Sequence, residues 1–418
     1  MTGAEWLAIA AVLLCALAIL PGTLGILMLT NRIAASAPGA RLIYGKSKWV
    51  LALSGAVMAV AVYQALSAGT ATTWIFLGAV AVYGGTLVFG FLMHTRMLFR
   101  PIRKPMFMSV DQAIEKFGPD EEVVGVIDDS GTPYAFIARL ARRPHIVYQP
   151  DGAAPFLMTH CILAHSSMAY AMEGPFKQPD IMITAALSNN MVFYEKSNQC
   201  SVIQLHNRSR RGELPLRTIA TVAVSLATWK KLYPSSKVWY RNIEWRDIFY
   251  LKLLARADVI DPKSPVMVYP LQHKLDERLG MKSMVLGVLV GDQTRTYPVS
   301  LFEGGAHRLI HDEVGGVPLL VVAAYNGDYI QVFDRSLDDG RILTFRPAET
   351  EDHFIDRETG SQWAPTGECV AGALKGRRLD PVPHYNKIFW YVWSDFHPGT
   401  EIYQPAPVEE ARAAAPAA

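Results

Sequence analysis

The densest group of possible metal or redox ligands lies in residues 156–171, FLMTHCILAHSSMAYA. This stretch ends an apolar run with His160 and Cys161 and adds His165 four residues later. Imidazole and thiolate groups bind copper, zinc and iron, so the cluster predicts a metal site or a redox-active thiol. His145 lies one expected strand earlier and is the fourth candidate ligand.

The strand that carries these residues limits how they can act together. Side chains alternate between the two faces of an extended strand, so His160 and Cys161 would point in opposite directions. They could bind one ion only if the backbone turns at Cys161, and the following HSS segment is compatible with a turn. A structural role also stays open, because a cysteine at the end of an apolar strand often packs as a small hydrophobic residue.

Other signatures of chemistry are absent from the sequence. The chain contains no P-loop, no Gly-x-Gly-x-x-Gly after a strand, no HExxH and no Gly-x-Ser-x-Gly. Its net charge of +2 gives no reason to expect nucleic acid as a partner. The four cysteines are far apart and include no CxxC pair, which argues against a fold built on disulfides.

The first hundred residues predict a membrane anchor. A helix needs roughly 20 apolar residues to cross a bilayer core of about 30 Å. Three uncharged runs meet this length, and each begins with a tryptophan: Trp6–Leu29, Trp49–Leu66 and Trp74–Met93. We interpret the first run as a retained helix and not as a signal peptide, because MTGAEW has no basic residue.

Lysine and arginine residues predict the orientation of this anchor. The loop between the first two runs and the segment after the third carry eight of them, whereas the N-terminal segment and SAGTATT carry none. This asymmetry places the N-terminus outside and the region after residue 104 in the cytoplasm.

The rest of the chain has a sequence pattern typical of strands joined by turns, and it contains an internal repeat. Gly125 corresponds to Gly287, His145 to His307 and Trp229 to Trp393, at a shift that stays within 161–164 residues. A long constant period indicates a duplication. The fold class we expect is therefore an α-helical membrane anchor of three transmembrane helices, followed by two tandem β-rich (α+β) soluble modules.

The expected boundaries follow from these patterns. They are a transmembrane region (1–104), a first β-rich module (105–241), a helical connector (242–283), a second β-rich module (284–405) and a disordered tail (406–418). Within the first module, residues 105–118 predict a short helix, with Ser109 and Gln112 as a capping box and Gly118 as its stop.

The second module resembles the family catalogued as domain of unknown function 3179. The resemblance covers nearly all of residues 284–405 and rests on motifs that recur in order. These motifs are VLGV, TYPV, VFDR, FIDRETGSQW, TGECVAGALKG and FWYVWSDFHPGTEIY. The first module resembles the family more weakly.

The resemblance also bears on the chemistry of Cys161. Members of that family typically carry a Cys-Pro-Leu-Cys-Gly-type motif after this strand, and some are selenoproteins, which implies redox chemistry. In this sequence the first family cysteine falls on Cys161, but the second falls on Ala164. The glycine that follows the second family cysteine falls on His165. In the second module, the positions that match Cys161, Ala164 and His165 are Ala324, Gly327 and Asp328. Exchange by a CxxC dithiol is excluded, which leaves single-thiol redox, a His/Cys metal site or loss of chemistry.

Two functions follow from these observations. The favoured one is an integral membrane accessory or assembly subunit, whose degenerate modules bind other membrane protein subunits. The alternative is a membrane-anchored redox or metal-binding protein that uses Cys161 with copper, zinc or iron. We expect a multi-pass protein of a bacterial-type inner (plasma) membrane. The modules are cytoplasmic by charge count, with the periplasm as the alternative, because related proteins are commonly exported.

Overall fold

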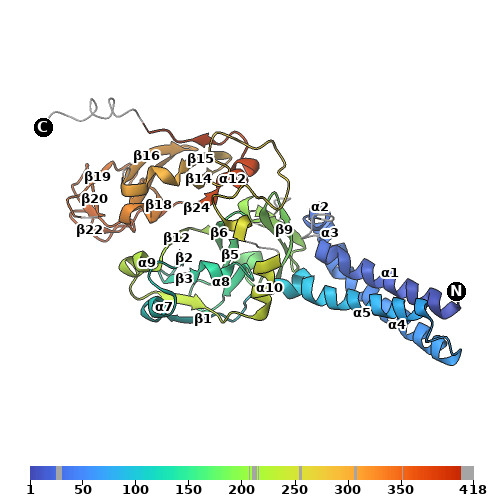
Figure 1. The fold of residues 1–418 in the computed structure, drawn as a ribbon. Coiled ribbons are helices and arrows are strands. Elements are labelled where there is room, and N and C mark those ends of the chain that lie inside the picture. Colours follow the sequence, from blue (N-terminus) through green and yellow to red (C-terminus); the bar gives the residue numbers. More distant parts are fainter. Residues whose placement is uncertain are drawn as a thin grey trace. The chain divides into compact units, whose positions relative to one another are not determined.

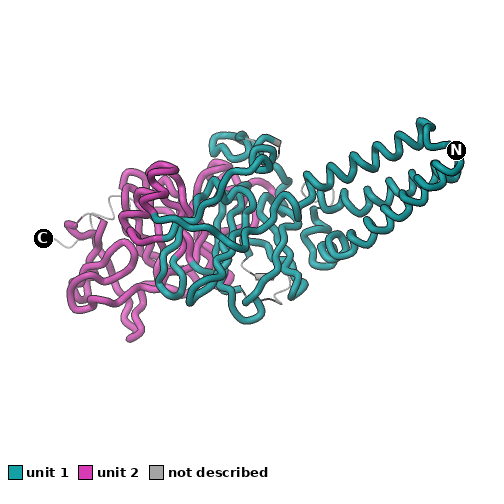
Figure 2. Tube along the Cα trace, turned by 90° about the horizontal axis from the view of Figure 1, so that it is seen from below, with its two compact units in different colours: residues 1–109, 127–219, 237–272 teal, residues 110–126, 220–236, 273–418 magenta. Residues whose placement is uncertain are grey.

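A computed structural model of the chain describes residues 1–24, 31–206, 208–209, 214, 216–253, 257–305, 308–350 and 352–405. Two compact units make up the fold, and neither is continuous in sequence (Figure 2). The first unit comprises residues 1–109, 127–219 and 237–272. The second comprises residues 110–126, 220–236 and the chain from residue 273 onward.

Three long helices begin the first unit: α1 (Gly3–Leu24), α4 (Ser47–Ser67) and α5 (Trp74–Met93) (Figure 1). All three are long and apolar enough to cross a membrane. They pack through small residues, because Ala8 of α1 and Ala61 of α4 are fully buried between them. The three predicted apolar runs are thereby confirmed as helices, while residues 25–29 of the first run lie outside the described part of the chain.

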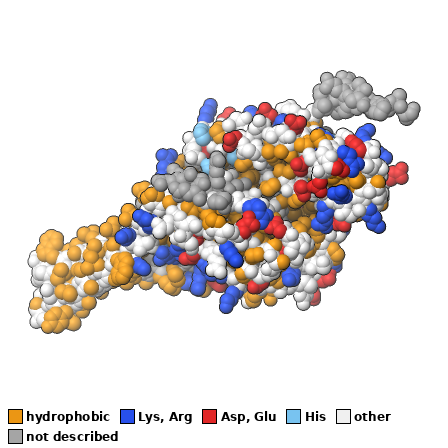
Figure 3. All heavy atoms as spheres, turned by 180° about the vertical axis from the view of Figure 1, so that it is seen from behind, with side chains coloured by type: hydrophobic (Ala, Val, Ile, Leu, Met, Phe, Trp, Pro, Cys, Tyr) orange, Lys and Arg blue, Asp and Glu red, His pale blue; other side chains and the backbone are white. Residues whose placement is uncertain are grey.

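Hydrophobic side chains cover the visible surface of this helical bundle, and lysine and arginine side chains gather where it joins the rest of the first unit (Figure 3). Short helical segments form the junction: α2 (Asn31–Ala34), α3 (Ala37–Ala40), η1 (Arg41–Lys46) and α6 (Thr95–Leu98). Apolar helices with lysine and arginine side chains gathered at one end are typical of a helix bundle that ends at a membrane surface.

The β-structure of the first unit consists of three antiparallel or mixed ladders. One has the order β11 (Thr218–Ile219), β6 (Ser166–Ala171), β5 (Phe156–Cys161), β4 (Ile146–Gln149). A second has the order β10 (Arg208–Ser209), β9 (Cys200–Ile203), β8 (Asn190–Glu195), β7 (Ile181–Leu187). In the third, β13 (Lys237–Tyr240) pairs with β1 (Met106–Ser109) and, in parallel, with β3 (Pro133–Ile137). Every residue of β5, β6 and β8 is buried, the polar residues included, so these strands lie in the interior of the first unit.

The second unit contains β2 (Glu122–Ile127), whose residues 122–126 belong to it, paired antiparallel with β12 (Thr221–Ser225). A four-stranded ladder has the order β24 (His384–Phe389), β14 (Met284–Val290), β15 (Gln293–Pro298), β25 (Glu401–Ile402). Another has the order β16 (Leu309–Val314), β17 (Val317–Ala324), β18 (Tyr329–Asp334), β23 (Asp380–Pro381). A small ladder of β19 (Phe345–Pro347), β20 (Phe354–Asp356), β21 (Gln362–Trp363) and β22 (Cys369–Ala371) completes it.

Among the described residues, further α-helices lie between these strands: α7 (Val110–Phe117), α9 (Leu226–Leu232) and α12 (Trp390–Phe396) in the second unit, and α8 (Ala138–Ala141) and α10 (Trp245–Leu253) in the first. Helix α11 (Ala257–Ile260) follows α10. The β-rich character of the chain after the three apolar helices is therefore confirmed.

Local differences from the sequence-based predictions have physical causes. The helix predicted over 105–118 is confined to α7, with Gly118 at a φ of +94° as its stop. Residues 106–109 form β1 instead, because pairing with β13 outweighs local helix preference. The connector predicted as helical over 242–283 is helical only in α10 and α11 among its described residues. His307 and the tail from residue 406 lie outside the described residues.

The module boundaries at residues 105, 242 and 284 stay a prediction about sequence repetition. The compact units follow a different division, because residues 110–126 and 220–236 join the unit that holds the C-terminal strands.

Candidate functional site

Strand β5 carries His160 and Cys161 in fully extended conformation. His160 lies opposite Ser167 of β6, and Cys161 lies opposite Ser166. The turn comes after Cys161, over residues 162–165, and His165 adopts a left-handed φ of 51° within it. His160 and Cys161 therefore stay on opposite faces of the strand, and the backbone does not bring their side chains to one point.

Cys161 is an interior residue. Its side chain is 3% exposed, and its Sγ donates a hydrogen bond of 3.6 Å to the carbonyl oxygen of Asn189. Burial raises the pKa of the Cys161 thiol. All four cysteines of the chain are buried and free. A protonated, buried thiol is a weak nucleophile and a poor metal ligand.

His145 lies beside β5 and is hydrogen-bonded to the backbone of that strand. His145 Nδ1 is 2.9 Å from the carbonyl oxygen of His160, and His160 N donates to the carbonyl oxygen of His145 at 2.8 Å. Since a carbonyl only accepts, Nδ1 carries the proton, and Nε2 accepts from the hydroxyl of Tyr250 at 3.3 Å. His145 is thus a neutral imidazole with both nitrogens engaged in structural contacts.

The other two histidines complete the neighbourhood of β5. His160 is 3% exposed, and its Nδ1 is 3.0 Å from the hydroxyl of Ser167. The half-buried ring of His165 meets the His160 ring edge-on, with 6.1 Å between centroids. Within the residues that the structure describes, no group of three or more His, Cys, Asp or Glu side chains is arranged to hold a metal ion. The four candidates are neighbours in the fold, but they do not surround one site.

Asn189 is a residue that the sequence did not single out. With Ser188 it forms the tight turn between β7 and β8, at φ values of 47° and 64° for Ser188 and Asn189. The Asn189 side chain is fully buried, accepts from the backbone N–H groups of Val268 and Tyr269, and donates to the carbonyl oxygen of Tyr269. The turn whose Asn189 carbonyl oxygen accepts from the Cys161 thiol is thereby hydrogen-bonded to residues 268–269.

A second buried polar group lies near the same face of β5 as Cys161, where Thr159 also points. Gln204 accepts from Ser166 Oγ at 2.6 Å and from Asn190 Nδ2 at 3.0 Å, and it donates to Thr159 Oγ1 at 2.9 Å. Thr159, Asn190 and Gln204 are all fully buried. A buried amide whose oxygen and nitrogen are both paired fixes strand register, so this network supports a structural purpose for the segment.

A buried cluster of charged side chains lies elsewhere in the first unit, around Asp247. Arg143 Nη1 donates to Asp247 Oδ1 at 2.6 Å, and Arg241 Nη1 donates to Asp247 Oδ2 at 2.9 Å. Arg143 also donates to Glu244 at 3.1 Å and to the carbonyl oxygen of Leu98 at 3.0 Å. Burial alone raises the pKa of Asp247, but the hydrogen bond from Arg241 and the nearby guanidinium charges lower it overall.

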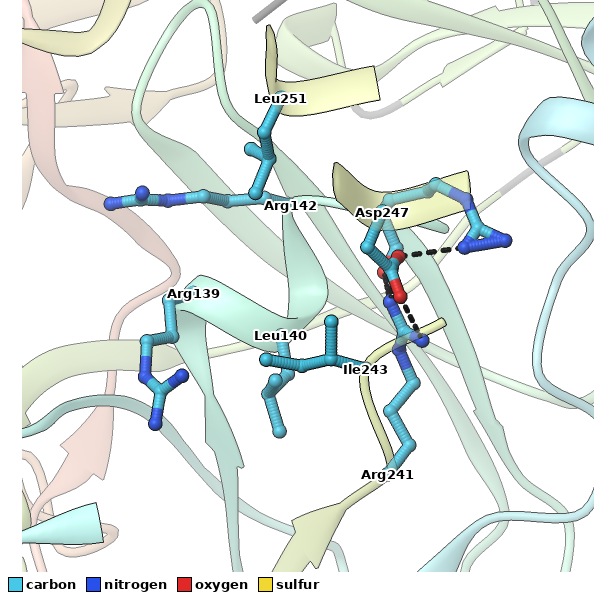
Figure 4. Close-up of a pocket in the computed structure, with 8 residues that line it drawn as sticks. Arg139, Leu140, Arg142, Arg241, Ile243, Asp247 and Leu251 are labelled. Carbon is cyan, nitrogen blue, oxygen red and sulfur yellow. Dashed lines mark hydrogen bonds and ion pairs between the residues drawn. The ribbon is translucent and has the colours of Figure 1, made fainter. Parts of the chain in front are cut away.

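A pocket of about 120 Å³ opens beside this cluster (Figure 4). Its lining residues are Arg139, Leu140, Arg142, Arg143, Arg241, Ile243, Asp247 and Leu251. Figure 4 shows Asp247 joined to guanidinium groups, while Arg139 and Arg142 extend away from it. No local pattern in the sequence predicts this pocket, because its residues come from segments about a hundred positions apart.

The burial of His145 predicts a pH-dependent stability. Burial lowers the pKa of His145 from its ordinary value of 6.5 to about 4, and the nearby Arg143 charge acts in the same direction, while the hydrogen bond to His160 opposes both. Between pH 4 and 6.5 the unfolded chain therefore binds a proton that the folded chain does not. We expect the free energy of unfolding to fall by about 1.4 kcal/mol for each pH unit below 6.5 until pH 4.

The matched variant is His145→Asn, because asparagine tolerates the left-handed φ of 72° at this position. Urea titrations at pH 7.5, 6 and 5 should show a pH dependence that is shallower in the variant by one proton. An identical pH dependence in both proteins would mean that the pKa of His145 is the same in the folded and the unfolded chain.

Comparison with known protein families gives one match. The model of a family described as Protein of unknown function (DUF3179) matches residues 100–400. No curated protein and no solved structure matches the chain.

Proposed function

Because the chain belongs to the family of proteins of unknown function DUF3179, we propose its function from the geometry alone: it is a multi-pass membrane protein that serves as an accessory or assembly subunit. In this proposal the three apolar helices span a bacterial-type inner membrane. The β-rich region is an interaction surface for other membrane protein subunits, and Cys161 performs no redox or metal chemistry.

The observation that carries this proposal is the hydrogen-bonded junction between the helices and the strands of the first unit. The Asn31 side chain accepts from the N–H of Ala186 at 3.0 Å and donates to the carbonyl oxygen of the same residue. Tyr44, 1% exposed, donates to the carbonyl oxygen of Thr184 at 3.0 Å, and Arg96 donates to the carbonyl oxygen of Tyr44 at 2.7 Å. Strand β7 is thus hydrogen-bonded to the base of the helices, as a subunit that presents a fixed surface at the membrane requires.

The surroundings of Cys161 support the absence of thiol chemistry. A redox thiol needs solvent access, a lowered pKa or a second thiol. Cys161 is buried and has a raised pKa, and the position where the family pattern implies a second cysteine holds Ala164. Tyr250, which hydrogen-bonds His145, is also buried, and burial raises its pKa, with Cys161 as a smaller cause.

We further propose that two degenerate copies of one module make up the β-rich region. Matching pairings support this: β2 with β12 and β14 with β24 are antiparallel, whereas β3 with β13 and β15 with β25 are parallel. The three-stranded runs β4–β5–β6 and β16–β17–β18 also follow the same order.

Side-chain contacts repeat in the same way. Trp229 packs on Gly125, and its indole N–H donates to Ser236, seven residues later, at 2.7 Å. Trp393 packs on Gly287, and its indole N–H donates to Thr296 at 2.7 Å and to Thr400, also seven residues later, at 3.3 Å. A tryptophan that covers a strand glycine and bonds a hydroxyl seven positions on is a specific arrangement, and its repetition favours common origin over coincidence.

The orientation of the protein is also part of the proposal. The base of the helical bundle carries Arg32, Arg41, Lys46 and Lys48, which favours the cytoplasmic side for the β-rich region. Labelling of introduced cysteines in intact cells and in permeabilised cells tests this orientation, and labelling in intact cells with an impermeant reagent would place the region on the opposite side.

The functional test compares Cys161→Ala with Asn31→Ala in native membranes. We expect Cys161→Ala to leave the apparent size of the solubilised complex unchanged, with a loss of roughly 1 kcal/mol in stability. Asn31→Ala removes both bonds to Ala186 and should weaken assembly. Native gel migration and complementation of a deletion strain are the measurements.

Two outcomes would contradict the proposal. One is migration of the wild-type protein as a monomer of 46.2 kDa protein mass, with no companion subunit. The other is loss of complementation in Cys161→Ala at normal protein level, which would restore the redox or metal alternative.

A further inference from the structure

Helix α10 leaves an apolar face uncovered. Ile243, just before the helix, is 58% exposed, and Trp245 and Ile248 are 53% and 51% exposed. Trp245, Ile248 and the exposed Lys252 are three and four residues apart, so they share one face of the helix. A tryptophan, an isoleucine and a lysine on one face match the composition of helices that lie in a membrane interface.

The opposite face of α10 is fixed in the first unit. Asp247 and Tyr250 are 4% and 5% exposed. Asp247 is held by Arg143 and Arg241, and the Tyr250 hydroxyl bonds His145. The helix cannot rotate to bury Trp245 and Ile248 without breaking these contacts, so their exposure is imposed by the fold.

The position of α10 beside the end of α5 indicates what covers this face. The Arg246 guanidinium lies 5.2 Å from the ring centroid of Phe91, in the last turn of α5, and 4.8 Å from that of Trp245. Phe91 is itself 52% exposed on a helix that is apolar enough to cross a membrane. The apolar surface of α5 therefore continues onto α10 at the level where the span ends.

We infer that the face formed by Ile243, Trp245 and Ile248 rests on the lipid surface of the bilayer, as an interfacial helix. This inference rests on the proposed insertion of α1, α4 and α5 in that membrane. The apolar side chains enter the boundary between headgroups and acyl chains, and Arg246 and Lys252 reach the phosphate groups. The lipid contact adds a lateral support to the β-rich region beside the three spans.

Spin labels on introduced cysteines test the inference in the full-length protein. The protein is reconstituted in nanodiscs of phosphatidylcholine and phosphatidylglycerol, and each label is measured for collision with molecular oxygen and with a water-soluble nickel chelate. The sites are Ile248→Cys, Val82→Cys on the outside of α5, and Ala153→Cys in the exposed loop between β4 and β5. The native cysteines are buried and serve as the unlabelled background.

We expect the ratio of oxygen to nickel accessibility to be several-fold higher at 248 and 82 than at 153. If 82 reports lipid while 248 matches 153, the interfacial helix is refuted and the membrane insertion of α5 stands. If 82 and 248 both match 153, the proposed membrane insertion fails with it.

A second measurement avoids a label on α10. Brominated lipids quench tryptophan fluorescence at short range, so the wild-type protein should lose more fluorescence than Trp245→Phe when such lipids replace ordinary ones. Equal fractional quenching in both proteins would overturn the inference, because it would place Trp245 away from lipid.

Discussion

Asp247→Asn is expected to lower the free energy of unfolding of the first unit by about 3–5 kcal/mol. The carboxylate of Asp247 is shared by two guanidinium groups, and the side chains of Arg143, Arg241 and Asp247 are 9%, 10% and 6% exposed. The neutral amide would take the carboxylate charge away from Arg241 and leave Arg143 paired only with the exposed carboxylate of Glu244. Removal of one partner from a buried ion cluster therefore lowers the free energy of unfolding strongly, even where the intact cluster contributes little net stability.

Urea titration of the detergent-solubilised protein, followed by tryptophan fluorescence, measures this loss. The matched control is Asp129→Asn, because Asp129 also pairs with an arginine, Arg217, but both side chains are nearly half exposed. The control should cost about 1 kcal/mol or less. Equal losses in the two variants would mean that water reaches the Asp247 cluster and screens it.

Alanine at Gly125 or Gly287 is expected to destabilise the second unit by about 3 kcal/mol, at the upper end of the range for overpacked cores. A Cβ at position 125 would lie 2.2 Å from Trp229 Cζ3, and one at 287 would lie 2.6 Å from Trp393 Cε3. Neither indole can move aside, because both are fully buried and hydrogen-bonded through their N–H groups.

A double-mutant cycle identifies the cause of that loss. Gly287→Ala is combined with Trp393→Phe, and Gly125→Ala with Trp229→Phe, and thermal unfolding is measured for each set. The smaller ring makes room for the methyl group, so the double variants should lose less stability than the sum of the single ones. Strictly additive losses would show that the glycines are needed for a reason other than the tryptophan contact.

The sequence was most informative where structure depends on local composition. The three apolar helices and the β-rich remainder were predicted because uncharged runs and alternating strand patterns are visible within twenty residues. The candidate site depended on contacts that no local pattern encodes. His145 bonds the backbone of His160 and the hydroxyl of Tyr250, 105 positions away, and Asn189 fastens the segment at 268–269.

Residue type alone also overstated the chemistry of the histidines. Two imidazoles and a thiol in six positions predict a ligand cluster, but the extended conformation of β5 places His160 and Cys161 on opposite faces, and His165 lies in the turn that follows. No local pattern in the sequence distinguishes Arg143, Arg241 and Asp247, although they form a buried charge cluster in the first unit. Burial and pairing with distant residues decide which polar side chains stabilise the fold or could do chemistry, and both are visible only in the folded structure.

The interleaved composition of the two units sets the order in which the chain can fold during synthesis. Residues 110–126 and 220–236 leave the ribosome before residue 273 onward, with which they form a compact unit. Ser225 caps α9 and binds the carboxylate of Asp328, 103 positions later, through both its N–H and its hydroxyl. The second unit is therefore completed only after nearly complete translation. Truncation after residue 241 would leave β2, β12 and α9 packed on one another but without the rest of their unit. A nascent chain paused there would depend on chaperones to keep the uncovered apolar surface from aggregating.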